Sequence, residues 1–257
     1  MPGGFVNEVV RDRDTVRRYQ SPKAAFVHAL LELFAQHSWT GAPRFLGLDS
    51  AGKEILSFVP GCAAWEPVQP ADVSCDESLA AVAALVRQFH DLTAGTILAG
   101  TQQVVCHNDL SPKNTIYRDL GHGLRPIAFV DWDLAAPGLR IHDVAHMCWQ
   151  YVNLGPSIPD PSEAIPALRI LCDAYGLGAR ADLVRTILWW QDRCWRGIES
   201  GAASGDPACC ALREAGKVQE VRASSAWVSR HYRVLDEGIR YRPARIVTGM
   251  TDWPDDS

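Results

Sequence analysis

The sequence lacks the features of membrane-spanning and secreted proteins. No apolar run approaches the roughly 18 residues that a membrane-spanning helix needs, and candidates such as residues 79–86 are short and rich in alanine. The first ten residues contain neither the basic segment nor the apolar segment of a secretory signal peptide. We therefore expect a cytoplasmic protein with no membrane partner.

Cysteine motifs and positive charge are also scarce. None of the 8 cysteines belongs to a Cys-x-x-Cys pair, which argues against a zinc ribbon and a thioredoxin-type site. The chain has 25 Lys+Arg and 30 Asp+Glu, a net charge of -5. Because non-specific binding of nucleic acid needs a basic surface, we expect no nucleic-acid partner.

The N-terminal quarter of the chain is rich in strand signals. The 257 residues, 47% of them hydrophobic, suffice for a globular protein with a sizeable core. The pattern predicts two short strands within residues 5–19, a helix beginning at Ser21, and strands at 45–48 and 55–59. A stretch rich in proline, glycine and alanine follows at 60–74, where we place a boundary between two lobes.

The remainder of the chain is predicted to be helical around two short strands. Apolar residues recur at helical spacing over 79–92, 168–175 and 183–195. Strand-like pieces lie between these stretches, at 103–106 and 127–130. The predicted fold class is α+β in two lobes, with an N-lobe of residues 1–60 and a larger helical C-lobe of residues 61–257.

Four polar residues after the two strand-like pieces suggest phosphoryl transfer. His107, Asp109 and Asn114 stand in the spacing H-x-D-x-x-x-x-N, and Asp131 follows the second apolar piece. Phosphoryl transfer asks the protein mainly to position groups and to neutralise charge. Asp109 is placed to accept the proton of an acceptor hydroxyl, while Asn114 and Asp131 offer the hard oxygen ligands that Mg²⁺ prefers.

These segments resemble the aminoglycoside phosphotransferases and related small-molecule kinases, which share the protein-kinase-like fold. The resemblance is strongest at 106–114 and 129–145 and weaker at 3–18, 41–47 and 55–61. It implies a bilobal fold with a small strand-rich N-lobe and a larger helical C-lobe. The strand that normally precedes the glycine loop has almost no residues here to form it, so we expect it to be missing.

The resemblance also implies roles for individual residues. Asp109 would be the catalytic base, and Asn114 and Asp131 would bind Mg²⁺. The further implied residues are Gly3 and Gly4 in the phosphate-covering loop, Arg17 near the phosphates, Ser57, Phe58 and Val59 in a hinge at 56–61 that contacts adenine, His107 and Asp143 as supports of the catalytic loop, Asp133 behind the metal or touching it, and Asp192 and Glu199 at the acceptor.

Two of these assignments remain open in the sequence. Arg17 neighbours Arg18, and strand alternation turns only one of the two inward. The helix residue that would pair with Arg17 is either His28 or Glu32. The default interpretation of Asp192 and Glu199 is a solvated helix face, which is the ordinary place for acidic residues.

The function implied by the resemblance is an ATP- and Mg²⁺-dependent phosphotransferase that acts on a hydroxyl of a small molecule, such as an aminoglycoside, a macrolide or an amino alcohol. Ser111 stands where protein kinases carry a lysine, and Asp131-Trp132-Asp133 replaces their Asp-Phe-Gly, which disfavours a protein kinase. The alternative is a kinase-fold binding module without catalytic activity.

Overall fold

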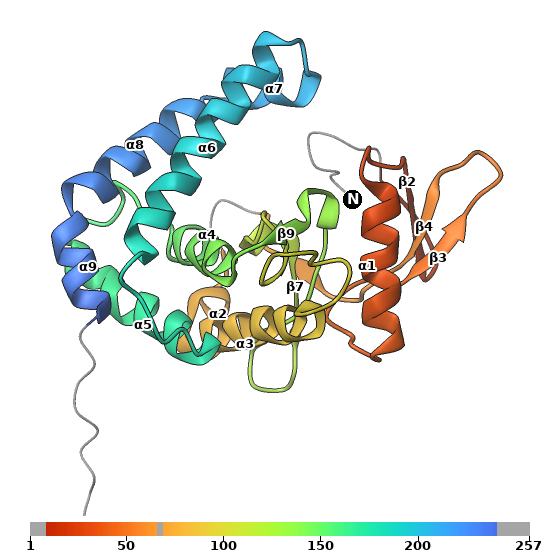
Figure 1. Ribbon diagram of the computed structural model, residues 1–257, viewed down its shortest axis with the longest axis horizontal. Coiled ribbons are helices and arrows are strands. Elements are labelled where there is room, and N and C mark those ends of the chain that lie inside the picture. The colour runs from red at the N-terminus through yellow and green to blue at the C-terminus, as the bar shows by residue number, and fades with distance from the viewer. Residues whose placement is uncertain (1–8, 66–68, 241–257) are drawn as a thin grey trace, which may run out of the picture.

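The computed structural model describes residues 9–65 and 69–240. Figure 1 shows a small β-sheet with one helix beside it, next to a larger and mostly helical part formed by the later residues. Gly3 and Gly4, expected in a phosphate-covering loop, lie outside the described residues. None of the helices within the described ranges is long and apolar enough to cross a membrane.

Four antiparallel strands form the N-terminal sheet. They are β1 (Val10–Asp12), β2 (Thr15–Arg18), β3 (Phe45–Leu48) and β4 (Glu54–Ser57), and their order across the sheet is β1-β2-β4-β3. β4 begins one residue before its predicted start and ends two residues before its predicted end. The register places Arg18 of β2 directly opposite Glu54 of β4, and this pairing becomes important for the site.

One helix packs beside the N-terminal sheet. Helix α1 (Ala24–Gln36) begins three residues after Ser21, because the Ser21 hydroxyl accepts a hydrogen bond from the backbone N–H of Lys23 and so forms a separate turn. Val27, Leu30, Leu31 and Phe34 of α1 are buried, at the spacing of one helix face. The helix therefore turns its apolar side toward the rest of the protein.

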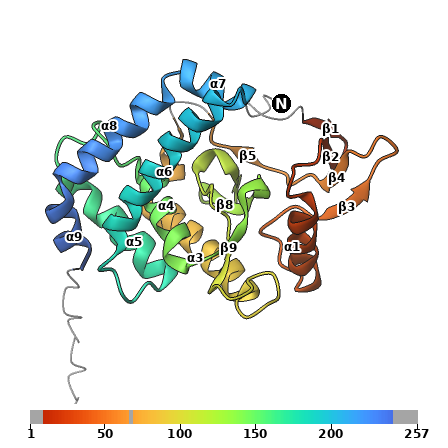
Figure 2. The same cartoon turned by 45° about the horizontal axis from the view of Figure 1, so that its top comes forward.

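Helices dominate the C-terminal part. They are α2 (Ala71–Ser74), α3 (Asp76–Thr93), α4 (Arg140–Val152), α5 (Ile165–Tyr175), α6 (Leu183–Ala203), α7 (Pro207–Glu214), α8 (Lys217–Arg230) and α9 (Tyr232–Arg240). Figure 1 and Figure 2 both show α6 and α8 side by side, with α7 joining them at the end away from α9.

Short strands in the C-terminal part position the polar residues of the site. β6 (Val104–Cys106) pairs with β9 (Ala136–Gly138), and β5 (Cys62–Ala63), β7 (Thr115–Asp119) and β8 (Leu124–Phe129) form a second sheet. Thr115 lies opposite Phe129 in the β7–β8 hairpin. The hairpin thus brings the residue before β7, Asn114, beside the end of β8.

An aromatic cluster joins α1 to the C-terminal part. The ring of Phe34 lies 5.1 Å from that of Trp132, 6.4 Å from that of Phe89 and 4.7 Å from that of Trp39. Phe34, Phe89 and Trp132 are buried. Since Trp132 lies between Asp131 and Asp133, the same cluster fixes the backbone that carries these two carboxylates.

Three buried histidines make hydrogen bonds between separate segments of the C-terminal part. His90 of α3 donates through Nε2 to Asp143 (3.1 Å), and His146 of α4 donates through Nδ1 to the carbonyl of Leu110 (2.9 Å). His107 donates through Nε2 to the carbonyl of Val130 (3.1 Å). Burial lowers the pKa of all three histidines, so each is neutral near pH 7.

Removal of the Phe34 ring should destabilise the protein strongly. We expect Phe34→Ala to lower the free energy of unfolding by about 3–5 kcal/mol, because a large side chain is lost from a packed core. Leu48→Ala, at a half-exposed position of β3, should change it by less than about 0.5 kcal/mol. Urea unfolding followed by circular dichroism measures both values, and equal losses in the two variants would contradict the described packing.

Acid should destabilise the protein from about pH 6.5 downward, near the ordinary pKa of histidine. Below that pH, His90, His107 and His146 become protonated in the unfolded chain. They stay neutral in the folded protein, because folding lowers their pKa values. Each histidine should then reduce the free energy of unfolding by about 1.4 kcal/mol per pH unit, until the pH reaches its folded pKa.

Urea unfolding at pH 7.5, 6.5 and 5.5 measures this slope. His146→Asn should reduce the slope of the unfolding free energy against pH by the contribution of one histidine. His122→Gln, a substitution of an exposed residue, should leave this slope unchanged. A free energy of unfolding that stays constant from pH 7.5 to 5.5 would overturn the expectation.

Candidate functional site

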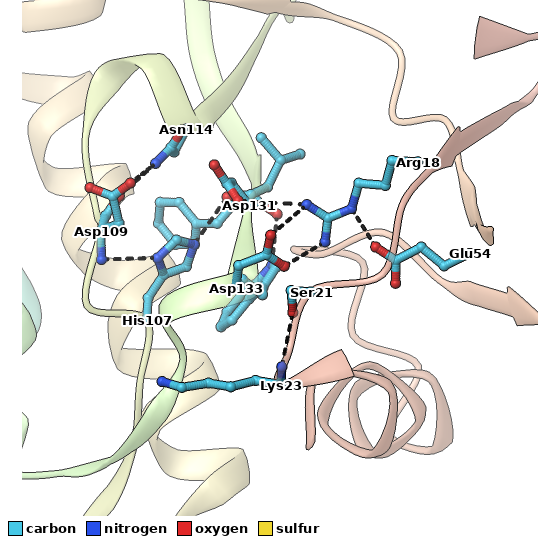
Figure 3. Close-up of polar contacts among 12 residues, drawn as sticks. Arg18, Ser21, Lys23, Glu54, His107, Asp109, Asn114, Asp131 and Asp133 are labelled. Carbon is cyan, nitrogen blue, oxygen red and sulfur yellow. Dashed lines mark hydrogen bonds and ion pairs between the residues drawn. The ribbon is translucent and has the colours of Figure 1, made fainter. Parts of the chain in front are cut away.

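The segment after β6 brings Asp109 and Asn114 into contact. The side-chain amide of Asn114 donates hydrogen bonds to Asp109 Oδ2 (2.7 Å) and to the carbonyl of Asp109 (2.9 Å). Figure 3 shows this contact on the loop that also carries His107. Because its nitrogen is turned toward Asp109, the amide oxygen of Asn114 is the atom left to hold a cation.

Asp131 follows β8 on the other side of the hairpin. The backbone N–H of Val130 donates to the carbonyl of Asn114 at 2.9 Å, which ties the two segments together. Asp131 has a left-handed φ of 64°, and half of its side chain is exposed. The β7–β8 hairpin therefore places Asp131 next to the Asp109–Asn114 pair.

Like charges crowd around Asp131. Burial and then the carboxylates of Asp133 and Asp109 raise the pKa of Asp131 to about 6. Since half of the side chain is open to water, the crowding is the more telling of these causes. Crowded carboxylates beside an amide oxygen gain from a hard divalent cation, so these residues fit a Mg²⁺ ion.

The arginine that reaches this cluster is Arg18. Its guanidinium donates to Asp133 at 3.0 and 2.7 Å, lies 3.6 Å from Asp131, and donates through Nε to Glu54. Figure 3 shows these contacts crossing from the N-terminal sheet to the segment after β8. Burial lowers the pKa of Arg18, but the charges of Asp133 and Glu54 outweigh this and raise it.

The expectation for Arg17 was wrong. Its side chain is 43% exposed and pairs with Asp12 at 3.1 Å on the outer side of the sheet. The strand alternates its side chains, and only the inward position has carboxylates to compensate a buried charge. Arg18 has those partners in Glu54 and Asp133, whereas the side chain of Arg17 lies on the more exposed side of the strand.

Neither predicted helix residue pairs directly with the inward arginine. Glu54 of β4, only 1% exposed, takes that place. His28 of α1 donates through Nε2 to Glu54 at 2.7 Å and stacks on Phe45, whereas Glu32 is exposed. Sequence reasoning missed Glu54, although an acidic residue opposite an arginine in a neighbouring antiparallel strand is a usable signal.

The expected adenine hinge lies where β4 leaves the N-terminal sheet. The backbone N–H of Ser57 donates to the carbonyl of Arg44 (2.9 Å), and that of Phe58 donates to the carbonyl of Asp14 (2.8 Å). A nucleotide base could use these two N–H groups only by displacing the existing bonds. Val59 is the next residue, and its side chain is partly buried.

Asp143 of α4 supports the backbone of the loop that carries Asp109. This carboxylate accepts hydrogen bonds from the backbone N–H groups of His107 (2.7 Å) and Asn108 (2.9 Å) and from His90 Nε2 (3.1 Å). Burial alone would raise the pKa of Asp143, but the bonds and charges of His90 and its neighbours lower it. Sequence reasoning did not identify His90.

His90, Cys106 and Asp143 lie close enough to suggest a metal site. Their potential ligand atoms are all within 4.8 Å of one another, and all three residues are buried. However, both oxygens of Asp143 already accept N–H donors, and burial raises the pKa of the Cys106 thiol. Hydrogen bonding accounts for this cluster.

Helix α6 faces the catalytic loop with Cys194. Burial and the charge of Asp109 raise the pKa of Cys194 to about 11, against the opposite effect of Lys113. At about 100° per residue, Asp192 and Glu199 point well away from this side. Asp192 pairs with Arg196 at 2.8 Å and Glu199 is exposed. The two predicted acceptor residues thus lie on the other side of α6 from Cys194, and their role at an acceptor stays a prediction.

Comparison with known proteins agrees with this arrangement. Residues 65–183 match the family model described as the phosphotransferase enzyme family. The trifolitoxin immunity protein of Rhizobium leguminosarum bv. trifolii is 28% identical over 205 residues, which are 70% of this chain and 74% of that protein. The matched family segment contains Asp109, Asn114 and Asp131.

Two solved structures share the fold. A choline/ethanolamine kinase family protein from Mesorhizobium loti has a TM-score of 0.60 at 17% identity, covering 91% of each chain. An aminoglycoside phosphotransferase from Streptomyces rimosus, in complex with ADP and streptomycin, has a TM-score of 0.53 at 17% identity, covering 74% of this chain and 92% of that one. The predicted α+β protein-kinase-like fold, with an N-terminal antiparallel sheet and a mostly helical C-terminal part, is confirmed, and residues 65–183 of the chain are similar to the phosphotransferase enzyme family.

Proposed function

We propose that this protein is an ATP- and Mg²⁺-dependent phosphotransferase that acts on a hydroxyl group of a small molecule. The observation that carries the proposal is the meeting of Asp109, Asn114 and Asp131 at the β7–β8 hairpin, with the cation of Arg18 beside them. A general base, oxygen ligands for a metal and a phosphate-binding cation are the parts that phosphoryl transfer requires.

In the proposed mechanism, Asp109 orients the acceptor hydroxyl and takes its proton. The acceptor oxygen forms a bond to the γ-phosphorus while the bond from that phosphorus to the ADP oxygen breaks. Asn114 and Asp131 would hold Mg²⁺, which supplies charge neutralisation at the phosphates when bound. Asp143 keeps the backbone of the loop in place, so that Asp109 does not move during the reaction.

The nucleotide would lie between the two lobes, with the boundary at the 56–61 hinge. We place residues 1–60 in the N-lobe and 61–257 in the C-lobe, and the hydrogen bonds from Arg18 to Asp133 join the two lobes. A bound triphosphate would compete with Asp133 for the Arg18 guanidinium. We propose a cytoplasmic location, where ATP is available.

The relatives indicate the chemical class of the acceptor and not its identity. One solved relative holds ADP and streptomycin, and another belongs to the choline/ethanolamine kinase family, so hydroxylated small molecules are the proposed acceptors. The similarity to an immunity protein adds toxins that carry hydroxyl groups to the panel. Asp192 and Glu199 stay outside the proposed acceptor site because α6 turns them away.

The alternative is a binding module without catalytic activity. The contacts of Arg18 favour this alternative, because its N–H donors already face the carboxylates of Glu54, Asp133 and Asp131, which a phosphate would have to displace. A thermal-shift titration separates the alternatives at the first step, because a protein that binds Mg·ATP gains stability that grows as RT ln(1 + [L]/Kd) with the ligand concentration [L]. ADP release with a panel of hydroxylated acceptors then tests for transfer.

Loss of the Asp109 carboxylate should stop transfer and spare nucleotide binding. We expect Asp109→Asn to lower kcat by about 10²–10⁴-fold, because the acceptor proton has no base to receive it. Coupled assay of ADP release measures kcat, and thermal shift measures the Kd of Mg·ATP. Asp182→Asn, on an exposed carboxylate, serves as the control. Normal turnover of Asp109→Asn on the true acceptor would refute the assignment.

Arg18 and Arg17 form a matched pair for testing the phosphate cation. Arg18→Gln should raise the Kd of Mg·ATP by about 10-fold or more, roughly 1.4 kcal/mol, whereas Arg17→Gln should change it by less than about 2-fold, because Arg17 faces solvent on the outer side of the sheet. Isothermal titration calorimetry at a temperature where both variants are folded gives the two constants. Similar effects of the two substitutions would argue against the placement of Arg18 at the phosphates.

A further inference from the structure

Lys113 lies beside the catalytic base without any role assigned so far. It occupies the short 3₁₀ turn Pro112–Asn114, and its Nζ is 3.8 Å from Asp109 Oδ2, the oxygen that also accepts from Asn114. Its side chain is 49% exposed. Within the described part of the chain, no other lysine or arginine forms a recorded ion pair with Asp109.

The charge of Lys113 reaches beyond Asp109. It opposes the burial and the neighbouring carboxylates that raise the pKa of Asp131. It also opposes the burial that raises the pKa of the Cys194 thiol on α6. The ammonium therefore lies beside the proposed base and within electrostatic reach of Asp131 and of Cys194.

Arg18 and Lys113, the two cations of the site, differ in how many of their N–H donors already have an acceptor. Arg18 is buried, and all three of its guanidinium nitrogens donate hydrogen bonds: Nε to Glu54, and Nη1 and Nη2 to Asp133. The ammonium of Lys113 has three N–H donors, and one contact with Asp109 leaves the others free. Ser111, where a protein kinase carries its lysine, is buried, and its hydroxyl faces the carbonyl of Asp109.

We propose that Lys113 is a catalytic residue whose ammonium donates hydrogen bonds to the oxygens of the phosphoryl group while that group passes from ATP to the acceptor. The inference rests on the proposed function and names a further participant in it. The acceptor oxygen bonds to phosphorus, the bond to the ADP oxygen breaks, and the acceptor proton goes to Asp109. Lys113 stays protonated throughout, so no proton or electron is left unassigned.

Such a contact is strongest where charge develops in the transition state. Fixed donors aimed at that charge accelerate the chemical step more than they strengthen ground-state binding. Lys113→Met should therefore lower kcat by about 10²–10³-fold while the Kd of Mg·ATP changes little. Lys113→Arg keeps a cation and should recover part of kcat. A lysine that merely stabilised the loop would not show this separation of kcat from nucleotide affinity.

Binding of a transition-state analogue tests the inference without turnover. The probe is Mg·ADP with and without aluminium fluoride, titrated by calorimetry into the full chain. The wild-type protein should bind Mg·ADP more tightly with fluoride present, and Lys113→Met should lose about 10-fold or more of that gain. Lys217→Met removes an exposed lysine paired with Glu220 and should behave like the wild type.

The outcomes separate the inference from the proposed function. If Lys113→Met keeps the full gain from aluminium fluoride, the role of Lys113 is overturned and the phosphotransferase proposal stands. If the wild-type protein gains nothing from aluminium fluoride, or binds no Mg·ADP, both proposals are overturned. If the gain is lost in Lys113→Met and partly restored in Lys113→Arg, the inference is supported.

Discussion

The geometry of the catalytic segment depends on the buried carboxylate of Asp143. It accepts two backbone N–H groups from His107 and Asn108 and a third donor from His90. Asn108 has a left-handed φ of 65°, a conformation that a residue with a side chain adopts at some cost. Because the bonds to Asp143 offset that cost, Asp109 is held in a fixed position at the end of β6.

This support extends through the protein rather than ending at Asp143. Tyr175 of α5 donates its hydroxyl proton to His90 Nδ1 at 2.7 Å, which fixes the tautomer in which Nε2 carries the proton for Asp143. Helices α3, α4 and α5 thus act together on one loop. A network of this kind is stable only when every buried polar group has its partner, and it therefore depends on the neutral state of His90.

Local patterns in the sequence predicted much of the site, and long-range pairings account for what they missed. Asp109 and Asn114 are five residues apart on one loop, and Asp131 follows the second strand of the β7–β8 hairpin, so local patterns predicted that these three residues are neighbours. The choice between Arg17 and Arg18 depends on Glu54, which comes from another strand, and on Asp133, which lies more than a hundred residues later. No local signal contains that information.

The same limit applies to the helices. Periodicity over 183–195 predicted α6, but which side of α6 faces the catalytic loop depends on packing against α4 and α8. Asp192 and Glu199 were assigned to the acceptor from the family resemblance, and periodicity alone did not define which side of α6 the charges of Asp109 and Lys113 act on, which is the side of Cys194. The start of α1 moved for a local reason, since the Ser21 hydroxyl bonds within its own turn.

The ion pair between Arg18 and Asp133 links the two lobes in a way that bears on nucleotide binding. Breaking a buried ion pair without replacement is costly, because a charge is left unpaired. Exchanging Asp133 for a phosphate oxygen avoids that cost, since Arg18 stays paired with an anion and Asp133 is close to the cation that Asp131 would bind. If the protein binds nucleotide as proposed, its net affinity is a difference between two charge arrangements, and the carboxylates around Arg18 determine that affinity as much as the phosphates do.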